Sequence, residues 1–289
     1  MTVDSTATLV DFGEGRRLEQ FGGVLVDRPH PAATGLRLSG AAWAEVSLRY
    51  ADGEWHASRP LPDPWMASVP LPGGRLTTSL VLHLRPSPSG QVGLFLEHVE
   101  VSRWLAGVLE PGDRILSLFA HTGVATLAAA AAGGCVTHVD ASRQSIRTAR
   151  DNASSSELAG SAIRWIHDDC PAFVARLARR GERFRGIVLD PPSWGHGPNG
   201  QAFSIEKDLP ALVEMAAGLI DHPSPIVLVT SHTPGWDNRR LAALVESMPV
   251  AARSHARVES GALACEDGSG RRLGLGHFAR LSPRQSSDA

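Results

Sequence analysis

After residue 90, two patterns of apolar and polar positions alternate along most of the chain. Short apolar runs, typical of buried strands, occupy residues 114–119, 136–140, 163–167, 186–190 and 226–230. Between and after these runs, apolar residues recur at helical spacing over residues 123–132, 142–153, 171–180, 205–219 and 238–248. Strands that alternate regularly with helices predict a parallel sheet with helices packed on both of its faces.

The two ends of the chain follow other patterns. Residues 257–264 and 273–279 flank a turn-rich segment and predict an antiparallel hairpin. Before residue 90, short segments at residues 23–26, 43–50, 55–58 and 76–84 are separated by clusters of Pro, Gly and Asp, as in a small β domain. We therefore predict an α/β fold: a Rossmann-like, doubly wound, mostly parallel sheet that ends in an antiparallel hairpin, with a smaller N-terminal β-rich domain.

Turn-rich residues 85–90 mark the expected boundary between the two parts. This divides the chain into a β-rich domain over residues 1–90, a larger domain over residues 91–282 and a flexible tail over residues 283–289. Residues 91–97 are expected to form a short strand, and residues 100–109 a helix, at the start of the larger domain. With 289 residues and 43% hydrophobic residues, the chain is long enough for one large core and a satellite domain.

The composition limits the cellular environment and the binding partners that the chain can have. The longest apolar runs are too short and too rich in alanine to span a bilayer, so we expect a cytoplasmic protein without membrane contact. The three cysteines have no paired spacing, which predicts reduced thiols and no metal site. A formal net charge of −2 means that RNA could bind only at a local basic patch. Five arginines between residues 176 and 185 are either a solvated helix face or a phosphate track.

The first strand–helix–strand unit of the larger domain has the features of a nucleoside site. Its turn, residues 120–123, contains one glycine, whereas a dinucleotide site needs three and a phosphate-binding loop needs Gly-Lys-Ser/Thr. Asp140 ends the second strand, where a carboxylate can accept hydrogen bonds from both hydroxyls of a ribose. The remaining common ligand of such a unit is S-adenosylmethionine, which has no phosphate groups.

Two further acidic motifs follow strands of the same predicted sheet. Asp190-Pro191-Pro192 comes after the fourth strand and precedes Trp194, a combination suited to a planar target that forms hydrogen bonds. Asp168 and Asp169 come after the third strand. Either could accept a hydrogen bond from an adenine amine or cap the next helix.

These motifs together resemble the class I S-adenosylmethionine-dependent methyltransferases. The resemblance rests on residues 118–123, 138–142, 165–169, 190–192 and 197–200, and extends upstream through residues 17–24 and 93–98. More narrowly, the chain resembles the bacterial branch related to the large-subunit ribosomal RNA cytosine methyltransferases. The resemblance implies cofactor-binding roles, with the turn at the methionine part, Asp140 at the ribose and Asp169 at the adenine. The implied cofactor-binding residues are Phe119, Ala120, Thr122, Gly123, Asp140, Ala141, Asp168 and Asp169.

The substrate side departs from that branch. Its cytosine-C5 enzymes carry a cysteine nucleophile after the fifth strand, where this chain has Thr230-Ser231-His232, and the lysine expected after Asp-Pro-Pro is Ser193. Covalent attack on cytosine is therefore disfavoured. The expected catalytic residues are Asp190, Pro191, Pro192 and His232, and the expected substrate-binding residues are Trp194, His196 and Asn199. Glycine-rich residues 195–200 have the composition of a lid.

We accordingly predict an S-adenosylmethionine-dependent methyltransferase that acts on RNA without a cysteine nucleophile. Two alternatives stay open from the sequence. One is an N- or O-methyltransferase of small molecules, favoured by the neutral charge and the missing cysteine. The other is a cofactor-binding interaction module without catalysis. Neither the methyl acceptor nor the oligomeric state follows from the sequence.

Overall fold

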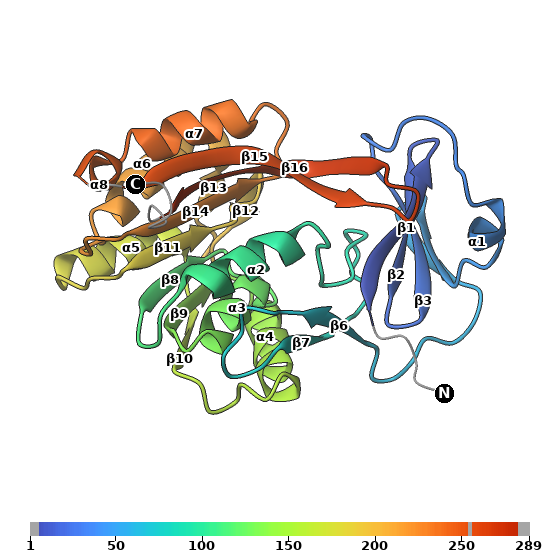
Figure 1. Ribbon diagram of the computed structural model, residues 1–289, viewed down its shortest axis with the longest axis horizontal. Coiled ribbons are helices and arrows are strands. Elements are labelled where there is room, and N and C mark those ends of the chain that lie inside the picture. The colour runs from blue at the N-terminus through green and yellow to red at the C-terminus, as the bar shows by residue number, and fades with distance from the viewer. Residues whose placement is uncertain (1–5, 254–255, 283–289) are drawn as a thin grey trace.

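The computed structural model describes residues 6–253 and 256–282, so the predicted tail at residues 283–289 lies outside the described residues. Its central feature is a seven-stranded sheet (Figure 1) with the order β10-β9-β8-β11-β14-β16-β15. The strands are β8 (Arg114–Leu118), β9 (Cys135–Asp140), β10 (Ile163–His167), β11 (Gly186–Leu189), β14 (Ile226–Ser231), β15 (Arg257–Glu266) and β16 (Arg272–Ser282). The first five in this order are parallel, and β16 and β15 are antiparallel. The predicted doubly wound sheet and its closing hairpin are confirmed.

Helices cover both faces of this sheet. One face carries α2 (His98–Val108), α3 (Val124–Ala131) and α4 (Arg143–Ser155), and the other carries α5 (Cys170–Arg179), α6 (Ile205–Ala217) and α7 (Asn238–Glu246). A short helix, α8 (Pro249–Arg253), follows α7. Ser142, Asp169 and Asp237 each cap a helix, because their side chains accept a hydrogen bond from a backbone N–H of its first turn. These polar caps fix where the chain leaves each strand and enters the next helix.

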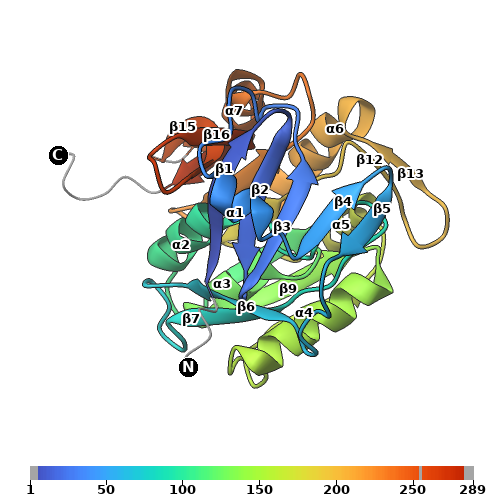
Figure 2. The ribbon, with the colours of Figure 1, turned by 90° about the vertical axis from the view of Figure 1, so that its right-hand side faces the viewer.

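The N-terminal part is a second sheet, seen face-on in Figure 2. It consists of β1 (Ala7–Gly13), β2 (Arg16–Phe21), β3 (Val24–Pro29), β4 (Leu48–Ala51) and β5 (Glu54–Ala57), with α1 (Gly40–Ala44) before β4. A separate hairpin contains β6 (Met66–Pro70) and β7 (Ser79–His83). The β-rich prediction is confirmed, but two segments were wrong: residues 43–50 are divided between α1 and β4, and residues 91–97 form no strand.

Buried charges between β2 and β3 explain why β2 escaped prediction. Arg28 on β3 is 2% exposed and lies 2.6 Å from the carboxylate of Glu19 on β2. Asp27 is equally buried and pairs with Arg16 at 2.5 Å and with Arg49 at 2.8 Å. Because charged side chains occupy inward positions, the alternation of apolar and polar residues that marks a strand is hidden.

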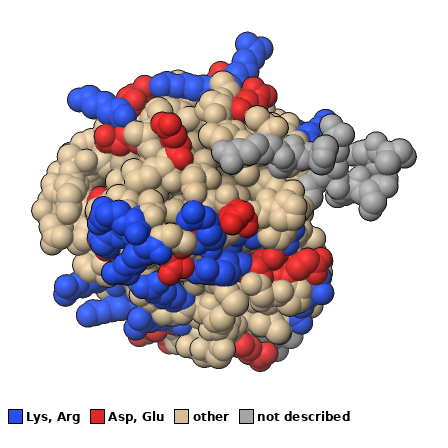
Figure 3. All heavy atoms as spheres, turned by 90° about the vertical axis from the view of Figure 1, so that its left-hand side faces the viewer, with Lys and Arg blue, Asp and Glu red and all other residues tan. Residues whose placement is uncertain are grey.

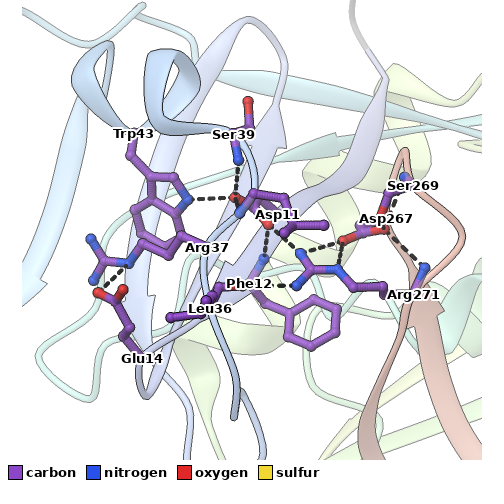
Figure 4. A network of polar contacts seen from close by, with 11 residues as sticks. Asp11, Phe12, Glu14, Leu36, Arg37, Ser39, Trp43, Asp267, Ser269 and Arg271 are labelled. Carbon is purple, nitrogen blue, oxygen red and sulfur yellow. Dashed lines mark hydrogen bonds and ion pairs between the residues drawn. The ribbon is translucent and has the colours of Figure 1, made fainter.

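A polar network joins the N-terminal sheet to the turn between β15 and β16 (Figure 4). The guanidinium of Arg271 forms ion pairs with Asp11 of β1 and, at 2.7 Å, with Asp267. It also donates to the carbonyl oxygen of Leu36 at 2.9 Å. The indole N–H of Trp43 donates to Asp11 at 2.7 Å from the opposite side. The long hairpin thus reaches from the large sheet to the small one (Figure 1) and is held there.

The β6–β7 hairpin contacts the large domain directly. The backbone N–H of His83 donates to the side-chain oxygen of Asn152 on α4 at 2.7 Å, and the amide of Asn152 donates to the carbonyl of Thr122 at 2.9 Å. Val81 makes a similar contact with Ser156 at 2.9 Å. Residues before the predicted boundary therefore support the turn that follows β8. The division of the chain at residue 90 stays a prediction.

The surface charge is uneven. Figure 3 views the end of the molecule that carries α5 in Figure 1, and lysine and arginine side chains gather on part of this face. Of the arginines near α5, Arg176 pairs with Asp168 and Arg185 with Asp113, whereas Arg179, Arg180 and Arg183 are exposed. Within the described part of the chain, no helix combines the length and the apolar composition that a membrane crossing requires.

Candidate functional site

A cavity of about 510 Å³ lies beside the carboxyl ends of β8 and β11. The chain reverses its direction of winding between these two strands, and open α/β sheets bind ligands at such a point. The volume is within the usual range for small-molecule sites. Nine of the predicted site residues border this cavity: Phe119, Asp140, Ala141, Asp169, Asp190, Pro191, Pro192, His196 and His232.

The turn after β8 is held in an uncommon backbone conformation. Phe119, His121 and Gly123 have φ values of 53°, 47° and 89°, in the left-handed region that non-glycine residues rarely adopt. The two non-glycine residues, Phe119 and His121, each cost about 1–3 kcal/mol and persist in this conformation where their surroundings impose it. At Gly123 a Cβ atom would also lie 3.0 Å from the Cβ of Ala149, so the single glycine of the motif allows α3 and α4 to pack closely.

Asp140 ties this turn to the end of β9. One carboxylate oxygen accepts from the backbone N–H of His121 at 2.7 Å, and the other accepts from that of Ser142 at 2.8 Å. A carboxylate has about four lone-pair positions, so further donors can bind. Asp140 borders the cavity, where it is available to the hydroxyls of a ligand.

The other predicted cofactor residues divide into two groups. Asp169 borders the cavity while its Oδ1 caps α5 by accepting from Ala172 at 2.9 Å, whereas Asp168 pairs with Arg176 and is absent from the cavity wall. Ala120, Thr122 and Gly123 border a separate space of about 40 Å³ behind the turn. The hydroxyl of Thr122 donates to the carbonyl of Gly93 at 2.7 Å, which supports the turn from that side.

Asp190, at the carboxyl end of β11, faces two imidazoles. Its Oδ1 accepts from the Thr230 hydroxyl at 2.5 Å and lies 3.7 Å from Nε2 of His232, while its Oδ2 lies 3.7 Å from Nε2 of His98. Burial alone would raise the pKa of Asp190, but His98 and His232 and the Thr230 hydrogen bond outweigh it, and the pKa lies below the usual range. Asp190 is therefore a carboxylate at neutral pH.

His98 was missing from the sequence-based set of site residues. It begins α2, and its Nε2 lies 3.2 Å from Nε2 of His232. The only signal was its place at the end of the upstream motif, residues 93–98. Other residues that border the cavity without having been predicted include Phe95, His121, Cys170 and Phe203. Each belongs to a different segment, so only the folded chain brings them together.

The glycine-rich segment after Pro192 forms a small hairpin of β12 (Trp194–His196) and β13 (Ala202–Ser204). The Trp194 side chain is 60% exposed and meets the ring of His196 edge-on at a centroid distance of 4.2 Å. His196 borders the cavity, whereas Trp194 and Asn199 do not. Trp194 is thus an exposed aromatic surface beside the cavity rather than part of its wall.

No reactive thiol faces the cavity among the described residues. Cys170 borders the cavity, but burial raises the pKa of its thiol far above the usual range, and its sulfur accepts from the backbone N–H of Phe119 at 3.3 Å. Cys135 begins β9 and Cys265 lies on β15, and neither borders the cavity. A thiol that remains protonated is a poor nucleophile, so Cys170 does not replace the cysteine that the cytosine-C5 enzymes carry after the strand corresponding to β14.

Comparison with known proteins gives a consistent picture. No family model matches the chain. The chain is 33% identical over 130 residues to the ribosomal RNA large subunit methyltransferase K/L of Legionella pneumophila (strain Corby), a match that covers 45% of this chain and 18% of that protein. The protein of the same name from Aeromonas hydrophila is 32% identical over 138 residues, 47% of this chain and 18% of that protein. The match thus spans about a fifth of these relatives' length.

Solved structures match nearly the whole chain. The S-adenosylmethionine-dependent methyltransferase from Agrobacterium tumefaciens is 28% identical with a TM-score of 0.84, over 96% of this chain and 90% of that one. The structure of SMU.776 complexed with S-adenosylhomocysteine has a TM-score of 0.70 at 15% identity, over 97% of this chain and 76% of that one, and supports the fold alone. The first of these matches includes the N-terminal sheet as well as the large domain.

Proposed function

We propose that this chain, which belongs to the class I S-adenosylmethionine-dependent methyltransferases, transfers a methyl group from S-adenosylmethionine to RNA. The observation that carries the proposal is the cavity at the switch point of the sheet. Asp140 and the strained turn border it on one side, and Asp190-Pro191-Pro192 borders it on the other. The cofactor and the methyl acceptor would thus meet in one cavity.

The cofactor side suits a nucleoside with an amino-acid tail. Asp140 would accept hydrogen bonds from the ribose hydroxyls with the lone pairs that His121 and Ser142 leave free. Asp169 would accept from the adenine amine, and the backbone of the turn at residues 119–123 would face the methionine part. Asp168, held by Arg176, would act only by fixing the start of α5. When bound, S-adenosylmethionine supplies an electrophilic methyl group on a cationic sulfur.

The chain's own contribution to catalysis is alignment and proton acceptance. Pro191 and Pro192 fix the backbone beside the cavity, and Asp190 presents a carboxylate that can accept a hydrogen bond from a target N–H or O–H. His232 lies 3.7 Å from that carboxylate and can accept a proton when the target nitrogen or oxygen takes the methyl group. Because no thiol is available, the acceptor would attack the methyl group directly.

RNA is the favoured substrate class because relatives that match 130 and 138 residues of this chain are named ribosomal RNA large subunit methyltransferases. The exposed Trp194 ring beside the cavity is a surface on which an unstacked base can stack. Exposed arginines on the face shown in Figure 3 supply local positive charge to a chain whose net charge is −2. A cytoplasmic location remains a prediction.

The test is transfer of labelled methyl from S-adenosylmethionine to separate pools of RNA, protein and small metabolites. We expect label in RNA, and ribosomal RNA from a strain that lacks the gene should be the better acceptor because its sites are unmodified. Label only in the metabolite pool would support the small-molecule alternative. No label in any pool, with S-adenosylhomocysteine still bound, would leave the non-catalytic module.

A further inference from the structure

Three potential metal ligands converge where the acceptor side of the cavity meets the turn. They are His98 at the start of α2, Asp190 after β11 and His232 after β14. One donor atom from each lies within 4.8 Å of the other two.

The spacing of the two imidazoles matches ligands of a single ion. Their Nε2 atoms are 3.2 Å apart, and two nitrogens bound at about 2.05 Å to one tetrahedral ion would be roughly 3.3 Å apart. Each Nε2 also lies 3.7 Å from one oxygen of Asp190. A shift of well under 1 Å in the carboxylate would complete three-ligand coordination.

Second contacts orient these ligands in the way that metal-binding residues require. Nδ1 of His232 donates to the carbonyl oxygen of Leu275 at 2.8 Å, which leaves its Nε2 with the lone pair that faces His98. Glu97, which is buried, lies 3.5 Å from the same Nδ1, and one of its oxygens has no hydrogen-bond partner. A Cβ at Gly276 would lie 2.8 Å from Nδ1, so the glycine makes room for the ring.

The local charge favours a cation. With Nδ1 of His232 donating to a carbonyl oxygen, its Nε2 is left with a lone pair, and the oxygens of Asp190 add acceptors 3.7 Å from the two Nε2 atoms. Phe95 packs against both imidazoles, with centroid distances of 5.5 Å to His98 and 6.1 Å to His232, and forms an apolar wall beside them. Two histidines and one carboxylate are the preferred donors of divalent transition metals such as zinc.

We propose that His98, Asp190 and His232 bind one divalent transition-metal ion at the methyl-acceptor side of the cavity. Asp190 and His232 border the cavity, so an ion could enter from it, and three protein ligands would leave coordination positions for water or a substrate. A role of the ion in holding the acceptor rests on the proposed function and would replace proton acceptance by His232, whose Nε2 the ion would occupy, whereas the ion site itself does not rest on that function. The sequence predicted no metal site because the three ligands lie far apart along the chain.

The test is titration of the full-length, tag-free protein with Zn²⁺ by calorimetry after treatment with a chelator, and with Co²⁺ by visible absorption. We expect one ion per chain, and at least 100-fold weaker binding in His98→Ala and His232→Ala. His56→Ala is the matched control, because His56 is exposed on β5 in the N-terminal sheet. If either alanine variant fails to fold by circular dichroism, His98→Gln or His232→Gln takes its place.

The site is refuted if the unsubstituted protein binds no ion, or if binding persists in both variants or falls equally in His56→Ala. Neither measurement uses methyl transfer. A protein that binds one ion through these residues and labels no RNA therefore refutes the proposed function and leaves the ion site standing. A protein that labels RNA and binds no ion refutes the ion site and leaves the proposed function standing.

Discussion

The change Asp140→Asn tests the cofactor side most directly. Asp140 accepts from two backbone N–H groups, those of His121 and Ser142, and should also accept from ribose hydroxyls. Asparagine has one accepting oxygen and an NH₂ group, so one backbone donor would face another donor, and the negative charge would be lost. Both effects weaken ligand binding.

The magnitude follows from the strength of hydrogen bonds to charged groups, about 1.5–3 kcal/mol each. Two such bonds to a ribose would be reduced to one neutral bond of about 1 kcal/mol, a net loss of about 2–5 kcal/mol. This corresponds to roughly 30- to 5,000-fold weaker binding. Isothermal titration calorimetry with S-adenosylhomocysteine measures the dissociation constant without any methyl acceptor.

The matched control is Asp151→Asn, since Asp151 is exposed on α4 and does not border the cavity. It should bind S-adenosylhomocysteine as the unsubstituted chain does. If Asp140→Asn binds within threefold of the unsubstituted chain and unfolds at the same temperature, Asp140 is not the ribose ligand and the assignment of the cofactor side fails.

Four further predictions concern stability and reactivity. Arg271→Met should lower the free energy of unfolding in urea by about 2 kcal/mol. This is less than the roughly 3–5 kcal/mol of a fully buried pair, because Arg271 is 28% exposed and backbone donors still satisfy Asp11 and Asp267. If the two side chains are coupled, Arg271→Met should cause no further loss in a chain that already carries Asp11→Asn. Burial would raise the pKa of Asp267, but hydrogen bonds from Ser269 and Arg271 lower it below the usual value. The stabilisation by Arg271 should therefore be complete above about pH 4, the pKa of an aspartate in the unfolded chain, and should disappear as the pH falls through the pKa of Asp267 in the folded chain. A stability difference between Arg271→Met and the unsubstituted chain that does not change in acid would contradict this. A thiol reagent at pH 8 should modify the exposed Cys135 and spare Cys170 and Cys265. Burial raises the pKa of the Cys170 and Cys265 thiols, that of Cys265 to about 12, so both stay protonated at this pH. Mass spectrometry that finds Cys170 modified in the folded chain would refute this. Gly123→Ala should lower stability by more than 1 kcal/mol because its φ is 89°, and an unchanged thermal midpoint would show that the turn can relax.

The large sheet could be predicted almost strand by strand, whereas the N-terminal sheet could not. Strands such as β8 and β11 are buried on both faces, so their apolar runs are continuous and separated by recognisable helices. In β2 the inward positions include Arg17 and Glu19, which pair with each other, and Glu19 also pairs with Arg28 on β3. A sequence pattern does not reveal a charge that is buried with its counter-ion.

The candidate site divides along the same line. Asp140, the turn before it and Asp190-Pro191-Pro192 follow strands directly, so the strand pattern placed them at one edge of the sheet. The single glycine of the turn and the resemblance to methyltransferases then predicted the cofactor. His98 contacts His232 only because the segment before α2 packs beside the end of β14. Contrary to the expectation from the sequence, Asp168 does not border the cavity, because it pairs with Arg176 on α5. Local sequence determined the elements and the cofactor side, since these depend on neighbours along the chain. Tertiary packing alone decided the acceptor side, since its residues are brought together by long-range contacts.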